Sequence, residues 1–271
     1  MIESLHFIAP DGANTGARVA VPQATRASST TLVFVHGVGS TAAIWDRQLE
    51  AFGNDFACVA IELRGNGACK PDPDPSLITR AGFAQDVTTV LDALHVEHFT
   101  LVGCSLGGVV ALELYARAGQ RFDAIVTLGS FARYPDGERA AEGIIAAVRD
   151  AGSMPAFAQR RAAQLGLPPQ RMDETIEQMA CKSIPSYIAS TKATWTGDYT
   201  GMLSSIVVPA LVAYGERDPV VPLALSEELA AGIPSAQLAA VEGAGHVANA
   251  DNPAAFDALL LGFLERLGFT R

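Results

Sequence analysis

Ser105 is the residue whose surroundings in this sequence best suit covalent chemistry. It lies in the run Gly103-Cys104-Ser105-Leu106-Gly107, with a glycine two positions before it and another two positions after it. Since glycine has no Cβ, both positions leave room for a sharp turn that presents the serine hydroxyl. A hydroxyl is a poor nucleophile until a base takes its proton. The pattern predicts a nucleophilic serine and requires a base and an orienting acid elsewhere in the chain.

The base is expected to be His246, because it is the one histidine that follows Ser105. It lies in a glycine-rich loop after the strand-like residues 236–241. Asp218, which follows the apolar run 210–214, is expected to hold the imidazole in position, and Glu216 is its nearby rival. The expected order along the chain is serine, acid, histidine.

Two backbone N–H groups are expected to bind the negative oxygen that forms when the serine attacks a carbonyl. One belongs to Leu106, at the start of the helix predicted after Ser105. The other is assigned to Val38, in the glycine-rich turn after the apolar residues 32–35. His36 precedes this turn, and we expect it to brace the loop without transferring protons.

Four side chains are candidates for contact with a substrate: Trp45, Phe131, Arg133 and Trp195. Arg133 could pair with a substrate carboxylate, although a surface position is the alternative. The three aromatic side chains could instead belong to the core. His95 and His98 lie three residues apart without a cysteine or carboxylate cluster to complete a metal site, so we expect neither a metal nor another cofactor.

The elements that position these residues follow from the hydrophobic pattern. Strands are predicted at residues 5–8, 17–21, 32–35, 56–63, 99–102, 124–128, 210–214 and 236–241. Most alternate with predicted helices, which indicates an α/β protein with a mostly parallel sheet wrapped on both faces. The first two strands are expected to form an antiparallel hairpin at one edge.

Residues 132–199 break the alternation, because they contain predicted short helices and no convincing buried strand. This stretch is too long for an ordinary crossover. We therefore predict a core built from residues 1–131 and 200–271, with a helical cap at 132–199 over the carboxyl ends of the strands, where open α/β sheets bind ligands. The alternative is a long helical excursion without a role as a lid.

Five motifs in order resemble the α/β-hydrolase superfamily along nearly the whole chain. They are His36-Gly37, Arg64-Gly65-x-Gly67, Gly103-x-Ser105-x-Gly107-Gly108, Gly215-x-x-Asp218-x-Val220-x-Pro222 and Gly243-x-Gly245-His246. Within the superfamily the chain is most similar to the 3-oxoadipate enol-lactonase and small-carboxylesterase group, which includes cofactor-free perhydrolases.

The resemblance implies an eight-stranded α/β-hydrolase fold with an inserted cap and a Ser105–His246–Asp218 triad. Two departures affect one turn. Asn66 stands where these proteins usually carry histidine, and Cys69 lies near where serine is common.

The expected function is a serine hydrolase that cleaves a small carboxylic ester or lactone through an acyl-enzyme. The same residues would also serve a carbon–carbon bond hydrolase acting on a vinylogous diketone, or a cofactor-free perhydrolase. A ligand-binding receptor on the same fold is the non-enzyme alternative. Dehalogenases and epoxide hydrolases of this fold need aspartate at the nucleophile position, so Ser105 argues against both.

The composition narrows the range of partners. The 271 residues carry a net charge of −10, which argues against nucleic acid and anionic membrane surfaces. The spacing of the four cysteines does not suggest a disulfide framework, which is typical of a reducing compartment. The sequence also shows no signal-peptide pattern and no apolar run long enough to span a membrane, so we expect a cytoplasmic location. The expected partner is a small-molecule ester or lactone, and a homo-oligomer is left open.

Overall fold

A mixed sheet organises the molecule. The computed structural model describes residues 2–20, 30–67, 69–165, 167 and 169–269. Within these residues the chain forms one eight-stranded sheet in the order β1-β2-β4-β3-β5-β6-β7-β8. The strands are β1 (Glu3–Ile8), β2 (Asn14–Ala20), β3 (Thr31–Val35), β4 (Cys58–Glu62), β5 (Phe99–Cys104), β6 (Phe122–Leu128), β7 (Ala210–Gly215) and β8 (Ala236–Val241).

The sheet is parallel except at one edge. β2 pairs antiparallel with both β1 and β4, and every other neighbouring pair is parallel. This confirms the mostly parallel eight-stranded sheet and the hairpin at its edge. Residue 21, the last of the second predicted strand, lies outside the described residues. In a parallel arrangement the carboxyl ends of β3, β5, β6, β7 and β8 meet at one end of the sheet, which brings their following loops together.

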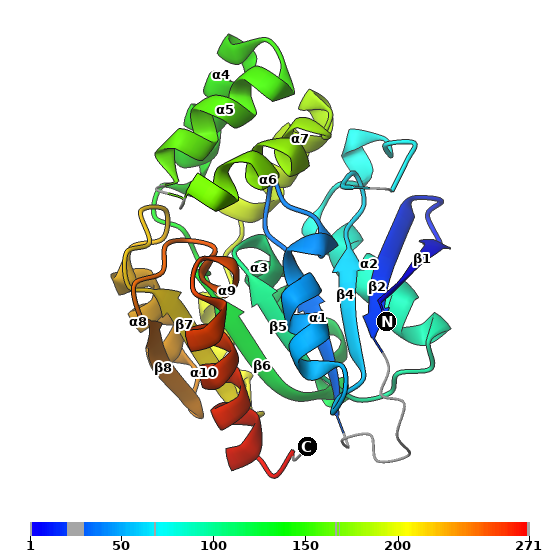
Figure 1. Cartoon of the computed structure of the whole chain (residues 1–271), viewed down its shortest axis with the longest axis vertical. Helices are drawn as coiled ribbons and strands as arrows, with labels where there is room; N and C mark the ends of the chain where they lie inside the picture. The colour runs from blue at the N-terminus through cyan, green and yellow to red at the C-terminus, as the bar shows by residue number, and fades with distance from the viewer. Residues whose placement is uncertain (1, 21–29, 68, 166, 168, 270–271) are drawn as a thin grey trace.

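Helices cover both faces of the sheet (Figure 1). One layer contains α1 (Asp46–Phe52) and α10 (Pro253–Arg266), and the other contains α2 (Arg80–Ala93), α3 (Leu106–Ala118) and α8 (Leu223–Gly232). Each layer has its own hydrophobic core against the sheet. Leu49 and Phe256 belong to the first core, and Val87, Val109 and Leu229 belong to the second.

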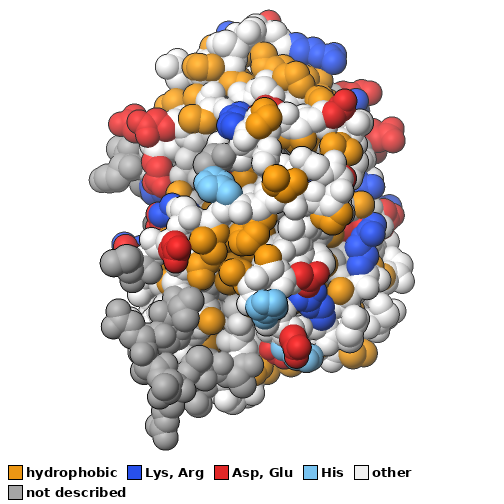
Figure 2. Space-filling view, turned by 90° about the vertical axis from the view of Figure 1, so that its right-hand side faces the viewer, with side chains coloured by type: hydrophobic (Ala, Val, Ile, Leu, Met, Phe, Trp, Pro, Cys, Tyr) orange, Lys and Arg blue, Asp and Glu red, His pale blue; other side chains and the backbone are white. Residues whose placement is uncertain are grey.

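The edge strand β1 is half exposed, and Figure 2 views the molecule from this side. Along β1, exposed residues alternate with the partly buried Leu5 and Phe7, which pack against the core. Such alternation is typical of an antiparallel strand with one solvated face. Acidic and basic side chains are interspersed over the face in Figure 2, with a compact group of hydrophobic side chains between them.

Four helices between β6 and β7 gather beyond one end of the sheet (Figure 1). They are α4 (Gly137–Ala151), α5 (Met154–Gln164), α6 (Pro169–Ala180) and α7 (Ile184–Trp195), and they share a small core of their own. The two ends of this segment meet, because Arg133 and Asp198 form an antiparallel bridge and Tyr199 N donates to Ala132 O over 3.0 Å. The division into a two-part core and a cap at 132–199 stays a prediction.

Short helical turns complete the described chain. They are η1 (Ala42–Trp45), η2 (Pro75–Leu77), η3 (Gly119–Arg121), η4 (Thr200–Ser205) and α9 (Ala248–Asp251). In the part of the chain that the structure describes, no helix has the length and apolar character needed to cross a bilayer.

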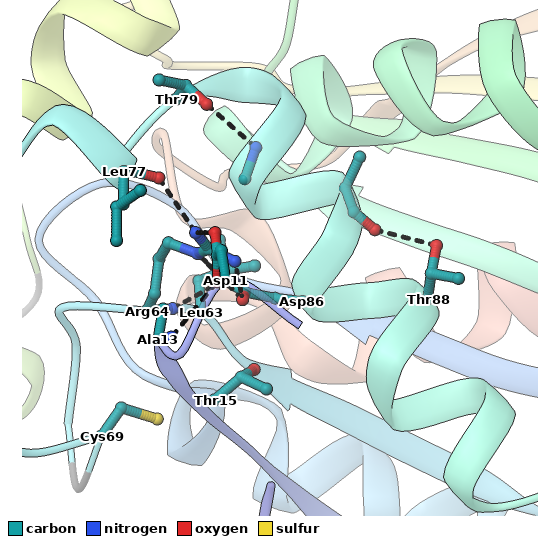
Figure 3. Close-up of polar contacts among 12 residues, drawn as sticks. Asp11, Ala13, Thr15, Leu63, Arg64, Cys69, Leu77, Thr79, Asp86 and Thr88 are labelled. Carbon is teal, nitrogen blue, oxygen red and sulfur yellow. Dashed lines mark hydrogen bonds and ion pairs between the residues drawn. The ribbon is translucent and has the colours of Figure 1, made fainter. Parts of the chain in front are cut away.

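A buried ion pair fixes the turn after β4 (Figure 3). The Arg64 side chain is fully buried, and its Nε donates to Asp86 Oδ1 on α2 over 2.9 Å. Its Nη1 donates to Leu77 O over 3.0 Å and also pairs with Asp11, in the turn between β1 and β2. Burial lowers the pKa of Arg64, but its hydrogen bonds and ion pairs with Asp86 and Asp11 have the larger effect, so the pKa is raised overall.

Asn66 is accommodated in this turn by hydrogen bonds of its own. It is buried, and its Nδ2 donates to Leu63 O over 3.0 Å and to Arg64 O over 2.8 Å. Cys69 is buried close by, with its thiol donating to Glu62 O over 3.6 Å. The two departures from the family pattern therefore fit the turn, and their side chains donate to the carbonyls of Glu62, Leu63 and Arg64.

Candidate active site

Ser105 joins β5 to α3 with a strained backbone. Its φ of 53° and ψ of −115° lie outside the regions that residues with a Cβ usually occupy. Close packing of the turn explains the flanking glycines. A Cβ at Gly103 would lie 2.2 Å from Gly107 O, and a Cβ at Gly107 would lie 2.1 Å from Val35 O. Only glycine fits at these two positions, as the sequence pattern predicted.

The backbone of Ser105 is held by its neighbours on β6 and the following loop. Ser105 N donates to Leu128 O over 2.8 Å, and the Ser130 hydroxyl donates to Ser105 O over 2.9 Å. Gly108 N, at the start of α3, also donates to Ser105 O over 2.9 Å. These bonds offset the conformational strain and hold the side chain at the carboxyl end of β5.

His246 and Asp218 form a hydrogen-bonded pair. Nδ1 of His246 lies 2.8 Å from Oδ2 of Asp218, and both side chains are almost completely buried. The other carboxylate oxygen of Asp218 accepts from Val220 N over 2.7 Å and from Val221 N over 3.0 Å. These two backbone donors fix the direction of the carboxylate, so its second oxygen is left facing the imidazole.

Glu216, the rival acid, points elsewhere. Its Oε2 accepts from Gly243 N over 2.8 Å and so ties the end of β7 to the loop that carries His246. Asp251 braces the same loop, since its Oδ2 accepts from Gly245 N over 3.1 Å. Of the two acids weighed from the sequence, Asp218 is the one that contacts the histidine.

The loop after β3 lies directly against Ser105. A Cβ built on Gly37 would come within 3.2 Å of Ser105 Cβ. His36 is fully buried beneath this loop, with Nδ1 2.9 Å from Gly37 O and Nε2 accepting from Leu63 N over 3.2 Å. These contacts agree with a bracing role for His36. Val38, the next residue after Gly37, lines the same cavity as Ser105.

Leu106 occupies the first position of α3. The first amide groups of a helix have no partner within the helix, and the helix dipole makes this end electropositive. The amide of Leu106 follows Ser105 directly in the chain, and the Gly37–Val38 loop packs against Ser105, so both are close to the serine, as oxyanion donors must be. Their role as oxyanion donors stays a prediction.

A narrow cavity of about 50 Å³ lies between the sheet and the helices α5, α6 and α7. Its core side includes Val38, Ser40, Ser105, Val220 and His246. Its helical side includes Arg161, Thr175, Gln178, Met179, Tyr187 and Trp195. Ser105 and His246 therefore face one shared space, which is mostly apolar apart from these few polar groups.

The structure brings one of the four predicted substrate contacts to this cavity, Trp195. Trp45 is fully buried in the core between Phe34 and Phe256, with ring centroids 5.0 and 6.1 Å away. Phe131 is buried behind Trp195, at 6.4 Å between ring centroids.

Arg133 does not reach the cavity either. It is exposed, and its backbone forms the bridge with Asp198 at the base of the inserted helices. Of the two positions left open for Arg133 by the sequence, the structure has the surface one, so a contact between Arg133 and the substrate is not supported.

Arg161 is the charged residue in the cavity wall that sequence reasoning missed. It lies on α5, between the arginine at position 160 and alanines. No local motif distinguishes Arg161 from Arg160, because only the rotation of α5 about its axis decides which of the two faces Ser105. Only the packing of α5 and α6 over Ser105 distinguishes the two arginines, and this packing is known only from the structure.

Among the described residues, no group of three or more histidine, cysteine, aspartate or glutamate side chains is arranged to hold a metal ion. All four cysteines are free. Cys104, next to the serine, is buried, and burial raises the pKa of its thiol far above the usual value. A thiol in this state is a poor nucleophile.

Comparison with known proteins agrees with this geometry. A model of the alpha/beta hydrolase family matches residues 32–259. The 3-oxoadipate enol-lactonase 2 of Acinetobacter baylyi is 27% identical over 251 residues, which span 90% of this chain and 92% of that protein. A crystal structure of a hydrolase from Pseudomonas aeruginosa PA01 is 28% identical, with a TM-score of 0.85 over 97% of this chain and 98% of that chain.

The fold is also shared with more distant proteins. The enol-lactonase from Burkholderia xenovorans LB400 is 22% identical and has a TM-score of 0.86, covering 96% of this chain and 99% of that chain. At this identity the likeness concerns the fold. The sheet order, the flanking helices and the family match over residues 32–259 together confirm the predicted fold and family. The protein belongs to the alpha/beta hydrolase family and its relatives support hydrolase activity.

Proposed function

We propose that this protein is a serine hydrolase that cleaves a small carboxylic ester or lactone through an acyl-enzyme intermediate. The observation that carries the proposal is the 2.8 Å hydrogen bond between His246 and Asp218 beside a cavity that His246 shares with Ser105. A family relative named as an enol-lactonase supports the lactone as one substrate type.

In the first step, Ser105 attacks the substrate carbonyl while His246 takes the hydroxyl proton. Asp218 holds the imidazole in the tautomer whose Nε2 is free to accept this proton, and it stabilises the imidazolium that results. The negative charge on the former carbonyl oxygen is bound by the amides of Val38 and Leu106. His246 then returns the proton to the leaving oxygen, and the acyl group stays on Ser105.

In the second step, His246 removes a proton from water, which attacks the acyl-enzyme. Collapse of the second tetrahedral intermediate releases the acid and restores the Ser105 hydroxyl. For a lactone, the leaving oxygen and the acid belong to one ring-opened product. No metal or organic cofactor enters either step.

The size of the cavity implies that its walls move when a substrate binds. About 50 Å³ holds one or two water molecules, whereas pockets for small ligands usually measure about 300 Å³ or more. A substrate therefore needs more room than the cavity offers, which a shift of α5, α6 or α7 or of their lining side chains would provide. This supports a role of the segment 132–199 as a cap.

The test is hydrolysis of p-nitrophenyl esters, from acetate to octanoate, by the wild type and by Ser105→Ala. The wild type should release p-nitrophenolate, and the acyl chain length with the highest kcat/KM measures the size of the pocket once it has opened. Ser105→Ala should lower kcat by at least about 10⁴-fold, because the acyl-enzyme cannot form. Circular dichroism of both proteins is the control for folding.

Either of two results contradicts the proposal. Turnover in Ser105→Ala equal to the wild type would remove the serine from the mechanism. Absence of turnover in the wild type on esters and lactones of all lengths would favour the binding-protein alternative. Analysis of the products would separate an esterase from a carbon–carbon bond hydrolase, and addition of peroxide would reveal a perhydrolase.

The compartment and partners follow the same proposal. We expect a small-molecule ester or lactone as the partner, neither nucleic acid nor a membrane, and a cytoplasmic location. The four free cysteines suit a reducing compartment.

A further inference from the structure

The cavity beside Ser105 has walls of two kinds. The core wall carries the groups proposed for catalysis, Ser105 and His246, and the helical wall carries polar side chains with no part in that mechanism. Among the described residues that line the cavity, none is acidic. The charge of the helical wall therefore comes from Arg161.

Arg161 is a half-buried cation without a counter-charge. Within the part of the chain that the structure describes, its guanidinium makes no hydrogen bond and no ion pair. Its neighbour Arg160 pairs with Asp150 over 2.7 Å, and Arg171 pairs with Glu174 on α6. A half-buried guanidinium beside a mostly apolar cavity is partly desolvated, so a ligand anion that pairs with it is bound favourably.

Two hydroxyl groups lie on the same wall. Tyr187 and Thr175 line the cavity, and in the described chain neither hydroxyl has a hydrogen-bond partner. The Tyr187 ring is fixed by an edge contact with Phe157 at 5.1 Å. Burial raises the pKa of Tyr187 to about 12, against the opposing charge of Arg161. The phenol is therefore protonated at neutral pH and can donate a hydrogen bond.

We propose that Arg161 binds a carboxylate on the substrate, away from the carbonyl that Ser105 attacks, with Tyr187 and Thr175 as additional donors. A planar guanidinium can bind both oxygens of a carboxylate, which makes this pairing directional as well as strong. The preferred substrate class is then an ester or lactone that carries a free carboxylate on a short carbon chain. The inference rests on the proposed function, because it names the substrate class of the same site.

The inference predicts a preference that two matched substrates can measure. One is the mono-p-nitrophenyl ester of glutaric acid, with a free carboxylate, and the other is the same compound with that carboxylate capped as a methyl ester. The wild type should have a kcat/KM about 10- to 100-fold higher for the free acid, because a charge-assisted pair is formed only with it. A partial loss of folded enzyme lowers kcat/KM for both substrates equally, so the ratio of the two kcat/KM values is unaffected by it.

Arg161→Met should lower this ratio about 10- to 100-fold, mainly through a higher KM for the free acid. Arg161→Lys should restore part of it, since the charge is kept and the planar fork is lost. Arg160→Met is the matched control, because Arg160 is the adjacent arginine on the same helix and pairs with Asp150 at the surface. Its ratio should equal that of the wild type. An unchanged ratio in Arg161→Met overturns the inference.

Failure of the proposed function gives a different pattern. If the wild type hydrolyses neither ester, the hydrolase proposal fails, and the carboxylate site is then tested by calorimetric titration of glutarate. Binding that weakens at least about 10-fold in Arg161→Met, but not in Arg160→Met, supports the site by itself. Equal binding by all three proteins, or none by the wild type, overturns it.

Discussion

At the scale of single residues, catalysis depends on geometry that the glycines and backbone donors impose. Ser105 adopts its strained conformation because Gly103 and Gly107 leave space around it. Asp218 faces His246 because two amides occupy its other oxygen. Substitutions at this scale should affect the rate of reaction more than the stability of the fold.

Asp218→Asn should lower kcat by about 10³- to 10⁴-fold on p-nitrophenyl butyrate. An amide can donate to Nδ1 of His246, which favours the tautomer whose Nε2 carries the proton and cannot act as a base. Steady-state kinetics measure the effect. Glu216→Gln is the control, because Glu216 contacts Gly243 and not the imidazole. Equal loss in the two variants would remove Asp218 from the proposed role.

The residues of the candidate site differ in how well the sequence predicts them. Ser105, Asp218 and His246 stand in loops with glycine or proline patterns that short-range sterics require, so local sequence indicates them. Arg161 and Thr175 stand on amphipathic helices, where the residues facing Ser105 depend on how α5 and α6 pack. Arg133 was a candidate partner for a substrate carboxylate with a surface position as the alternative, and the structure exposes it beside the bridge to Asp198.

At the scale of elements, Arg64 links four parts of the fold. It joins the end of β4 to α2 through Asp86, to η2 through Leu77, and to the β1–β2 turn through Asp11. Figure 3 shows these groups converging on one guanidinium. A charged group with no exposed surface needs its full set of partners, because water cannot replace any of them.

Asp86→Asn should lower the free energy of unfolding by about 3 to 5 kcal/mol, since it leaves the buried Arg64 charge without its main partner. Urea unfolding followed by circular dichroism measures the loss. Asp92→Asn is the matched control on the same helix, because Asp92 is 61% exposed and pairs with Arg121 at the surface. It should cost about 1 kcal/mol or less. Similar losses in both variants would contradict this account.

Helices and strands long enough to repeat their hydrophobic pattern several times are predicted well from the sequence. The structure has all eight predicted strands and a helix at each long periodic segment, including α2, α3 and α10. The short turns η2 and η4 and the four-residue α9 contain too few residues for a period, so sequence patterns do not reveal them. α6 begins with a proline at residue 169, which is compatible with the first turn of a helix.

At the scale of the whole molecule, Lys182 connects stability to pH. It lies between α6 and α7, is 5% exposed, and its Nζ has no hydrogen-bond partner in the described chain. Burial lowers its pKa to about 8. The charged groups that act on it are Glu62 and Asp72, which favour the ammonium, and Lys70, which opposes it; the Cys69 thiol also lies near.

The free energy of unfolding of the wild type, relative to that of Lys182→Met, should increase as the pH rises from about 8 to 10.5. In this range the unfolded lysine keeps its proton and the folded one has lost it, so unfolding takes up a proton and becomes less favourable as pH increases. The full change is about 3 kcal/mol, from the lowering of the pKa from 10.5 to about 8. Urea unfolding at pH 7, 8, 9 and 10 measures it.

The exposed Lys192 on α7 gives the control for this pH series. Its replacement by methionine should leave the pH dependence of the wild type unchanged, because an exposed ammonium has a similar environment in both states. A wild type and Lys182→Met whose stabilities change in parallel between pH 8 and 10 would show that burial of Lys182 is not coupled to its protonation.

The meeting of residues 132 and 199 at the base of the inserted helices has a consequence for how such a protein can change over generations. The chain leaves the sheet after β6 and returns to it at nearly the same place, held by the Arg133–Asp198 bridge. We therefore expect the sheet to tolerate changes in the length and sequence of these helices, apart from contacts such as the one between Gln178 and Ser40. Selection can therefore change one wall of the cavity, the one formed by α5 to α7, while the wall that carries Ser105 and His246 is kept.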